Sequence, residues 1–164
     1  MRRTSFAGMQ CSIARTLEVV GEWWTMLIIR DAFSGVRRFD DFQRSLGIAR
    51  NVLAGRLQTL VDHDILERRR YQERPDRFEY RLTPRGRDLY PVIVGLLGWG
   101  DRWATDSDPA PPVVLTHASC GHDVVPELTC PACHQAIAPQ AMRWRYAEHV
   151  PTEHRLGHRG VATR

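Results

Sequence analysis

The chain has 164 residues, of which 43% are hydrophobic and 26% charged, with a formal net charge of +4 and a pI of about 9.2. This composition is typical of a globular protein, and the length suffices for one core with a small appended module. No apolar run approaches the roughly 18 residues that a membrane-spanning helix needs. The first residues lack the apolar segment of a secretory signal. We therefore expect a cytoplasmic protein without a membrane partner.

All 23 basic residues are arginine. A GC-rich genome explains most of this bias, but the choice has a physical consequence. The arginine guanidinium is a rigid fork of donors that can hold a phosphate or the edge of a guanine. A basic chain of this size favours a nucleic acid as its partner.

The first part of the chain predicts two helices. Ser12 is the expected N-cap of the first helix, whose apolar residues recur at helical spacing. Gly21 marks a break, and a second helix is expected from Trp23 to Phe33. Tryptophans at helical spacing, at positions 23, 24, 99 and 103, are expected to lie in the core rather than to line a ligand pocket.

Two short helices joined by a glycine turn follow. The first is expected over residues 39–46, the turn at Gly47-Ile48, and the second over residues 50–63. The second helix places its inward residues at i, i+4, i+7 and i+8, namely Leu53, Leu57, Leu60 and Val61. This order predicts a helix-turn-helix.

A β-hairpin is predicted directly after these helices, which is the place of a wing. Its strands are expected over residues 65–71 and 78–82, around a turn over residues 72–77. Thr83 and Pro84 then predict the N-cap and first turn of a long helix that reaches Trp103, with a kink at Pro91.

The face of helix 50–63 opposite its leucines carries residues that can read base edges. Arginine pairs with guanine, asparagine and glutamine pair with adenine, and a small residue permits close approach to the groove. Arg56 is expected on the flank, within reach of phosphate, and the hairpin arginines are expected to meet the DNA backbone. The alternative is a solvated, salt-bridged hairpin, because acids alternate with these arginines. The candidate DNA-binding residues are Arg38, Arg50, Asn51, Ala54, Arg56, Gln58, Arg74 and Arg77.

Several blocks of sequence resemble the HxlR-type regulators, a branch of the MarR-like winged-helix proteins. They lie at residues 20–31, 38–42, 53–57 and 75–86, and the resemblance covers Cys11 to Trp103. It implies a homodimer joined through helices near residues 13–20 and 88–103, and repression more than activation. Many members carry Gly-Lys where this chain has Glu22-Trp23, which puts a backbone contact there in doubt.

Cys11 occupies the position of a cysteine that acts as a redox or electrophile sensor in similar regulators. A helix N-terminus makes a thiolate more available, and Arg15 lies one turn further on. The alternative, which we favour, is a partly buried structural cysteine.

The other three cysteines predict a zinc ribbon. Cys130-x2-Cys133 is a metal knuckle, and His117-x2-Cys120 has the same spacing, nine residues upstream. Zn²⁺ suits such mixed ligands, and four protein ligands indicate a structural site. His122 is the alternative fourth ligand, followed by His134. A nucleobase deaminase is excluded, because the His-x-Glu and Pro-Cys-x-x-Cys signature is missing.

These patterns predict an α+β chain with a winged helix-turn-helix domain, including its dimerisation helices, over residues 1–106. A proline-rich linker (107–112), a zinc-ribbon-like β module (113–141) and a basic tail (142–164) follow. We expect a non-enzymatic, sequence-specific regulator that binds a pseudo-palindromic duplex as a homodimer. A small-molecule effector is left open. The alternative function is a zinc-ribbon interaction module with a winged helix that does not bind DNA.

Overall fold

The computed structural model describes residues 5–6, 8–104 and 111–150. The chain divides into two compact units, one formed by Val19–Pro126 and the other by Met1–Glu18 with Glu127–Arg164. This division differs from the boundary expected near residue 106. Residues 107–110 of the expected linker and 151–164 of the expected tail lie outside the described residues.

The first four helices lie close to where the sequence places them. They are α1 (Ser12–Val20), α2 (Trp23–Phe33), α3 (Phe39–Leu46) and α4 (Arg50–Asp62). Ser12 belongs to α1 itself, and the amide of Arg15 donates to the carbonyl of Cys11 at 3.0 Å, so Cys11 is the residue that precedes the helix. Gly47 ends α3 in the left-handed region, with φ of 62°, which a glycine adopts without a steric penalty.

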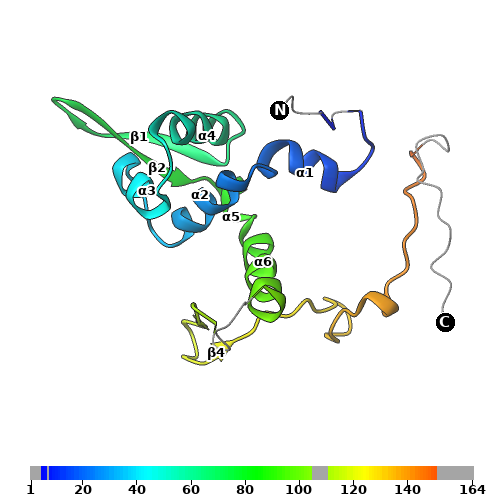
Figure 1. The fold of residues 1–164 in the computed structure, drawn as a ribbon. Helices are drawn as coiled ribbons and strands as arrows, with labels where there is room; N and C mark the ends of the chain where they lie inside the picture. The colour runs from blue at the N-terminus through cyan, green and yellow to red at the C-terminus, as the bar shows by residue number, and fades with distance from the viewer. Residues whose placement is uncertain (1–4, 7, 105–110, 151–164) are drawn as a thin grey trace. The chain divides into compact units, whose positions relative to one another are not determined.

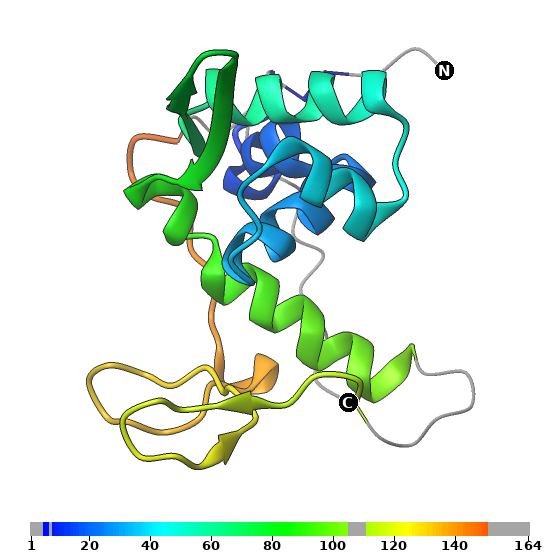
Figure 2. The ribbon, with the colours of Figure 1, turned by 90° about the vertical axis from the view of Figure 1, so that its left-hand side faces the viewer.

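The core of the larger unit is formed where α4 packs on α2 and α3 (Figure 2). The leucines predicted to face inward, at positions 53, 57 and 60, are fully buried. They meet Ile28 and Ile29 of α2 and Phe42 of α3, which are also fully buried. Residues three and four apart on a helix share a face, so this burial fixes the side of α4 that points to solvent.

The wing is longer than predicted, with β1 (Leu66–Glu73) paired antiparallel to β2 (Asp76–Leu82). It extends away from the helices (Figure 1). The expected six-residue turn is wrong, because the ladder continues through Gln72–Arg77 and Glu73–Asp76 after an irregularity near Tyr71. Only Arg74 and Pro75 remain between the paired strands, where proline costs no ladder hydrogen bond.

Two helices replace the single kinked helix expected after the wing. They are α5 (Pro84–Arg87) and α6 (Tyr90–Trp103). Thr83 caps α5 as predicted, since its hydroxyl accepts a hydrogen bond from the amide of Gly86 at 3.0 Å. Pro91 lies in the first turn of α6, so it starts a helix instead of kinking one, because a first-turn amide needs no helical acceptor.

An apolar stripe of α6 is exposed. Its members are Val92, Leu96, Trp99 and Trp103, and the two tryptophans are 62% and 69% exposed. Trp23 of α2 is also exposed, whereas Trp24 packs against the core. The expectation that the tryptophans belong to the core is therefore wrong for three of them. Periodicity identifies an apolar helix face but does not say what covers it.

A second small hairpin pairs β3 (Leu115–Thr116) with β4 (Asp123–Val124), where short strands were expected. Leu115 and Val124 share a cavity of about 170 Å³ with Val94 and Leu97 of α6. A single 3-10 turn, η1 (Pro139–Ala141), follows in the other unit. No helix among the described residues is long and apolar enough to cross a membrane.

We predict that Gly86→Ala destabilises the protein. A Cβ at this position would lie 2.1 Å from the carbonyl oxygen of Ile65, a backbone atom that cannot move aside alone. Overpacking of this kind costs about 1–3 kcal/mol. Thermal and urea unfolding measure the loss. The matched control is Gly55→Ala, where a Cβ meets nothing within 4 Å and helix propensity predicts a small gain. Equal stability of the two variants would contradict the steric argument.

Candidate nucleic-acid interface

The exposed face of α4 carries three of the predicted base-reading residues. Asn51, Ala54 and Gln58 are exposed, on the side opposite the buried leucines. Gln58 is engaged within the helix, because its amide nitrogen donates to Asp62 at 2.7 Å. Asn51 and Ala54 therefore offer an exposed polar and an exposed small side chain on this face.

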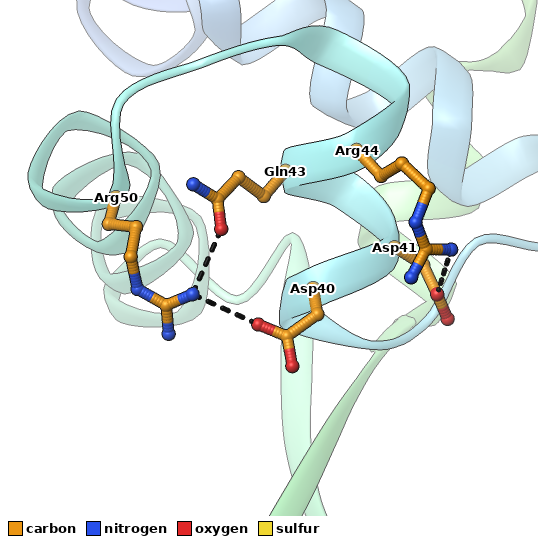
Figure 3. A network of polar contacts seen from close by, with 5 residues as sticks. All are labelled: Asp40, Asp41, Gln43, Arg44 and Arg50. Carbon is orange, nitrogen blue, oxygen red and sulfur yellow. Dashed lines mark hydrogen bonds and ion pairs between the residues drawn. The ribbon is translucent and has the colours of Figure 1, made fainter.

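Arg50 stands at the start of α4 and is tied to α3 (Figure 3). Its guanidinium donates to Asp40 at 3.1 Å and to Gln43 at 2.9 Å. The same group lies 4.8 Å from the centre of the Phe39 ring. These contacts link the two helices of the helix-turn-helix across their turn.

The guanidinium of Arg50 remains accessible to solvent despite these contacts. Both side chains of the Arg50–Asp40 pair are mostly exposed, at 66% and 74%. Such surface ion pairs are worth about 0–1 kcal/mol, whereas a bidentate contact to a guanine edge is worth about 1–3 kcal/mol. The Arg50–Asp40 ion pair therefore costs little free energy to break.

Arg56 has a different environment from the one expected. It forms an ion pair with Glu22, the residue before α2, at 3.1 Å, and the two side chains are 27% and 36% exposed. The guanidinium is thus occupied in joining α4 to the start of α2. The sequence reading placed Arg56 on the flank of its helix, but it missed Glu22 as the partner.

Arg38 borders a shallow hollow at the start of α3. Its guanidinium lies 4.7 Å from the centre of the Tyr71 ring, and its backbone forms an isolated antiparallel β-bridge with Glu79. Arg37 and Arg44 line the same hollow with Arg38. The sequence singled out Arg38 alone, because only the fold brings Arg44 of α3 beside the segment before that helix.

The wing arginines divide between the two expectations. Along the strands, Arg69 pairs with Glu67 and Arg70 with Asp76, both at 2.6 Å, and Arg68 stacks 3.6 Å from the centre of the Phe78 ring. Arg69 and Arg70 match the salt-bridged hairpin. At the tip, Arg74 and Arg77 are exposed, and neither pairs with a carboxylate within the described part of the chain. They are the wing arginines left for a phosphate.

Cys11 is half-buried just before α1. It lines a largely apolar pocket of about 560 Å³ with Met9, Ile13, Trp144 and Tyr146, all from the smaller unit. The guanidinium of Arg15 donates to Gln10 at 3.0 Å. The half-buried position agrees with the structural reading of this cysteine, and its role as a sensor stays a prediction.

The predicted zinc ligands lie in two tight turns. The ring of His117 is 3.3 Å from the sulfur of Cys120, measured from Nδ1. In the second turn, backbone amides of Cys133 and Ala132 donate to the sulfur of Cys130, and these bonds lower the pKa of that thiol. Among the described residues, no group of three or more histidine, cysteine or acidic side chains is placed to hold a metal ion.

The model of the HxlR-like helix-turn-helix family matches residues 19–108. The chain belongs to this family. The matched residues contain α2 to α6, and with them the exposed face of α4 and the wing. The family resemblance noted from the sequence is thereby confirmed.

Individual HxlR-like and related proteins extend the comparison. The HTH-type transcriptional regulator Rv3095 of Mycobacterium tuberculosis is 47% identical over 126 residues, covering 77% of this chain and 79% of the relative. The solved structure of PA1607, described as a candidate transcription factor, superposes with a TM-score of 0.76 at 39% identity and covers 88% of this chain and 100% of its own. The redox regulator HypR, in its reduced form, has a TM-score of 0.54 at 30% identity, over 60% of this chain and 100% of its own.

We predict a measurable coupling between Arg56 and Glu22 in this HxlR-like domain. A double-mutant cycle with Arg56→Ala and Glu22→Ala, read by urea unfolding, should give a coupling of about 0.5–1 kcal/mol, because both partners are partly shielded from solvent. The control cycle on Arg44 and Asp41, 77% and 45% exposed, should give less. A larger coupling in the control pair would contradict this assignment.

Proposed function

We propose that this chain is a sequence-specific transcriptional repressor that binds a pseudo-palindromic DNA site as a homodimer. One observation carries the proposal: α4 buries its leucines and exposes Asn51 and Ala54 on its outer face, and the wing exposes Arg74 and Arg77 near its tip. The name of Rv3095, an HTH-type transcriptional regulator, supports the same function. DNA-binding regulation of transcription is the function that family membership itself supports.

In this proposal α4 enters the major groove. Asn51 reads an adenine, Arg50 exchanges Asp40 for a guanine edge, and Ala54 permits close approach of the helix. Gln58 can contribute once its hydrogen bond to Asp62 is released. Arg56 acts indirectly, because its ion pair with Glu22 helps to set the position of α4.

The wing supplies contacts to the DNA backbone. Arg74 and Arg77 at its tip would meet phosphates beside the groove that α4 occupies, and Arg38 with its neighbours Arg37 and Arg44 would do the same near α3. Such contacts add affinity without sequence preference. They also make binding depend on salt, because each neutralised phosphate releases counterions.

The exposed stripe of α6 supports a homodimer. Val92, Leu96, Trp99 and Trp103 are spaced by four, three and four residues, which places them along one side of the helix. Two tryptophans this exposed are costly in water and are typical of an interface. We propose that two copies pair through this stripe, so that two copies of α4 reach successive major grooves.

The repressor role rests on the resemblance to HxlR-type regulators. A bound dimer would repress by occluding a promoter. A regulator of transcription works at the chromosome, and we place the chain in the bacterial cytoplasm on that ground. We also propose no catalytic activity. Oxidation of Cys11 and an apolar ligand beside it are the two signals that its pocket favours.

The test of the function is selection of bound duplexes from a random DNA pool at physiological salt. We expect an inverted repeat whose half-sites are one helical turn apart. Asn51→Ala should lower affinity for the selected duplex by about 10-fold or more, since a bidentate base contact is worth about 1–3 kcal/mol. The control is Arg85→Ala in α5, an exposed arginine remote from α4 in the sequence, which should change affinity little.

Recovery of no motif, or a motif indifferent to Asn51, would overturn the proposal. The winged helix would then serve another purpose, and the alternative of a protein-interaction module would take its place. Arg74→Ala gives an independent readout. It should lower affinity similarly for all duplexes and reduce the salt slope by about one, because one phosphate contact is lost.

The dimer has its own test. Leu96→Glu combined with Trp99→Glu should convert the protein to monomers in sedimentation equilibrium, because two charges in the stripe would have to be desolvated without partners. The control is Leu128→Glu, which places the same charge at an exposed apolar residue outside α6. Retention of the dimer by the α6 variant would place the interface elsewhere.

A further inference from the structure

We propose that the base of the wing carries a binding site for a small aromatic oxyanion, that is, one ring that bears a carboxylate or a phosphate. The site is a hollow of about 370 Å³, which we name the wing-base hollow. It belongs wholly to the unit Val19–Pro126, and its lining includes no residue of α4. The lining residues that carry the argument are Phe33, Arg37, Arg69, Tyr80, Arg81 and Arg87.

Hydrogen bonds of the backbone hold the surrounding segments together. The amide of Tyr80 donates to the carbonyl of Arg37 at 2.7 Å, which joins the segment before α3 to β2. The amide of Thr83 donates to the carbonyl of Ile65 at 3.1 Å, and this contact fixes the start of α5 against the start of the wing. Segments that are distant in sequence therefore meet around the hollow in a defined arrangement.

Two ion pairs lie on one face of the wing at this place. The ladder sets Glu67 opposite Arg81 and Arg69 opposite Glu79, so these four side chains point to the same side of the hairpin. Arg69 pairs with Glu67 at 2.6 Å, and Arg81 pairs with Glu79 at 2.7 Å. Each of these two arginines therefore has a carboxylate partner before any ligand binds.

The other two arginines add positive charge that these carboxylates do not balance. Arg37 and Arg87 are exposed, and neither forms an ion pair with a carboxylate of the described residues. Arg87 donates through Nη1 to the carbonyl of Leu82 at 2.9 Å, a neutral acceptor that leaves its charge in place. Four arginines against the glutamates at positions 67 and 79 leave an excess of two positive charges, which favours an anion.

Arg81 retains the donors that an oxyanion requires. It binds Glu79 through Nε alone, and no residue in the described ranges accepts a hydrogen bond from its two terminal Nη nitrogens. The Glu79 side chain is 15% exposed, so the pair is anchored on a largely buried partner and holds the Arg81 side chain in position. A guanidinium held in this way can donate two parallel hydrogen bonds to a carboxylate or a phosphate.

The same hollow has an apolar part. Phe33, Val36 and Leu82 line it and are half-buried. The ring of Phe33 packs against Tyr90 at 5.1 Å between centres, so its position is supported from behind the hollow's lining. Apolar side chains beside guanidinium groups suit a ligand with a planar apolar body, because arginine also stacks on aromatic rings.

The volume limits the size of the ligand. Sites for small molecules span about 300–1,000 Å³, and a cavity of about 150 Å³ holds benzene. A hollow of about 370 Å³ therefore accommodates one substituted ring and is small for a dinucleotide.

A DNA phosphate is the competing occupant, because Arg37 also lines the hollow that contains Arg38 and Arg44. Phosphate contacts need exposed donors and gain little from half-buried aromatic and aliphatic side chains. The apolar lining at Phe33 and Val36 therefore favours the aromatic ligand. The test variants avoid Arg37, since it belongs to both hollows.

The experiment titrates the full-length protein with phenyl phosphate in the absence of DNA, by calorimetry and by amide chemical shifts in NMR spectra. We expect one site per chain, with shifts centred on residues 32–37, 67–69 and 80–87. Inorganic phosphate lacks the ring and benzyl alcohol lacks the charge, so each should bind at least about 10-fold more weakly. Benzoate should bind at the same residues, because the hollow recognises the oxyanion and the ring together.

Arg87→Ala should weaken the binding of phenyl phosphate by about 10-fold, since a hydrogen bond to a charged group is lost. Arg85→Ala is the matched control, because it removes the same charge from the same helix at a residue that does not line the hollow. It should leave the affinity within about 2-fold, as is usual for an exposed charge at a distance. Arg81→Gln is a second variant with the expected behaviour of Arg87→Ala, and circular dichroism checks that each variant is folded.

Equal weakening by Arg87→Ala and Arg85→Ala would overturn the site, as would benzyl alcohol that binds as tightly as phenyl phosphate. Unchanged probe binding in Arg87→Ala, together with a lower affinity for the selected duplex and a reduced salt slope, would assign the hollow to DNA phosphates instead. The probe titrations contain no DNA and use no residue assigned to base contacts. Failure of this site and failure of the proposed DNA-binding function are therefore distinguishable.

Discussion

The burial of one leucine stripe orients the whole candidate interface. Leu53, Leu57 and Leu60 can leave water together only if α4 lies on α2 and α3 in a single rotation about its axis. That rotation sends Asn51 and Ala54 outward. Leucine-to-alanine changes in such a stripe typically cost about 2–5 kcal/mol each. No exposed polar contact on α4 could turn the helix against a cost of this size.

Electrostatic contacts act on this framework at a smaller scale, and solvent exposure decides which of them are replaceable. The pair between Arg50 and Asp40 is open to water, so it can give way to a ligand. The pair between Arg56 and Glu22 is more shielded and joins two helices, so it serves the scaffold. Two arginines six residues apart on one helix thus have different roles, although their chemistry is the same.

Two other parts of the chain expose side chains that folded proteins usually cover or bind. The stripe on α6 exposes apolar surface, and the short turn that contains His117 and Cys120 leaves both of these side chains exposed to solvent. Both exposed features are consistent with the length of the chain. A chain of this length has one substantial core, and that core cannot cover every apolar segment beyond it.

Most helices and strands could be predicted from local sequence signals, because periodicity, caps and turn residues are local properties. The leucine spacing of α4, Gly47 after α3, and Thr83-Pro84 before α5 each predicted what the structure contains. The same signals located the helix-turn-helix and most of the candidate base-reading residues. The family resemblance rested on the same blocks of residues.

The partner of each side chain, in contrast, depends on how the helices and strands pack together. The strands of the wing are longer than predicted, because pairing across the hairpin outweighs the turn preference of Pro75 and Asp76. Arg56 forms an ion pair with Glu22, and Arg44 lines the same hollow as Arg38. These residues are distant in sequence and meet only because the helices pack together. The tryptophans of α6 turned to solvent for the same reason: a pattern states that a face is apolar, but the packing of the whole chain determines whether anything covers it.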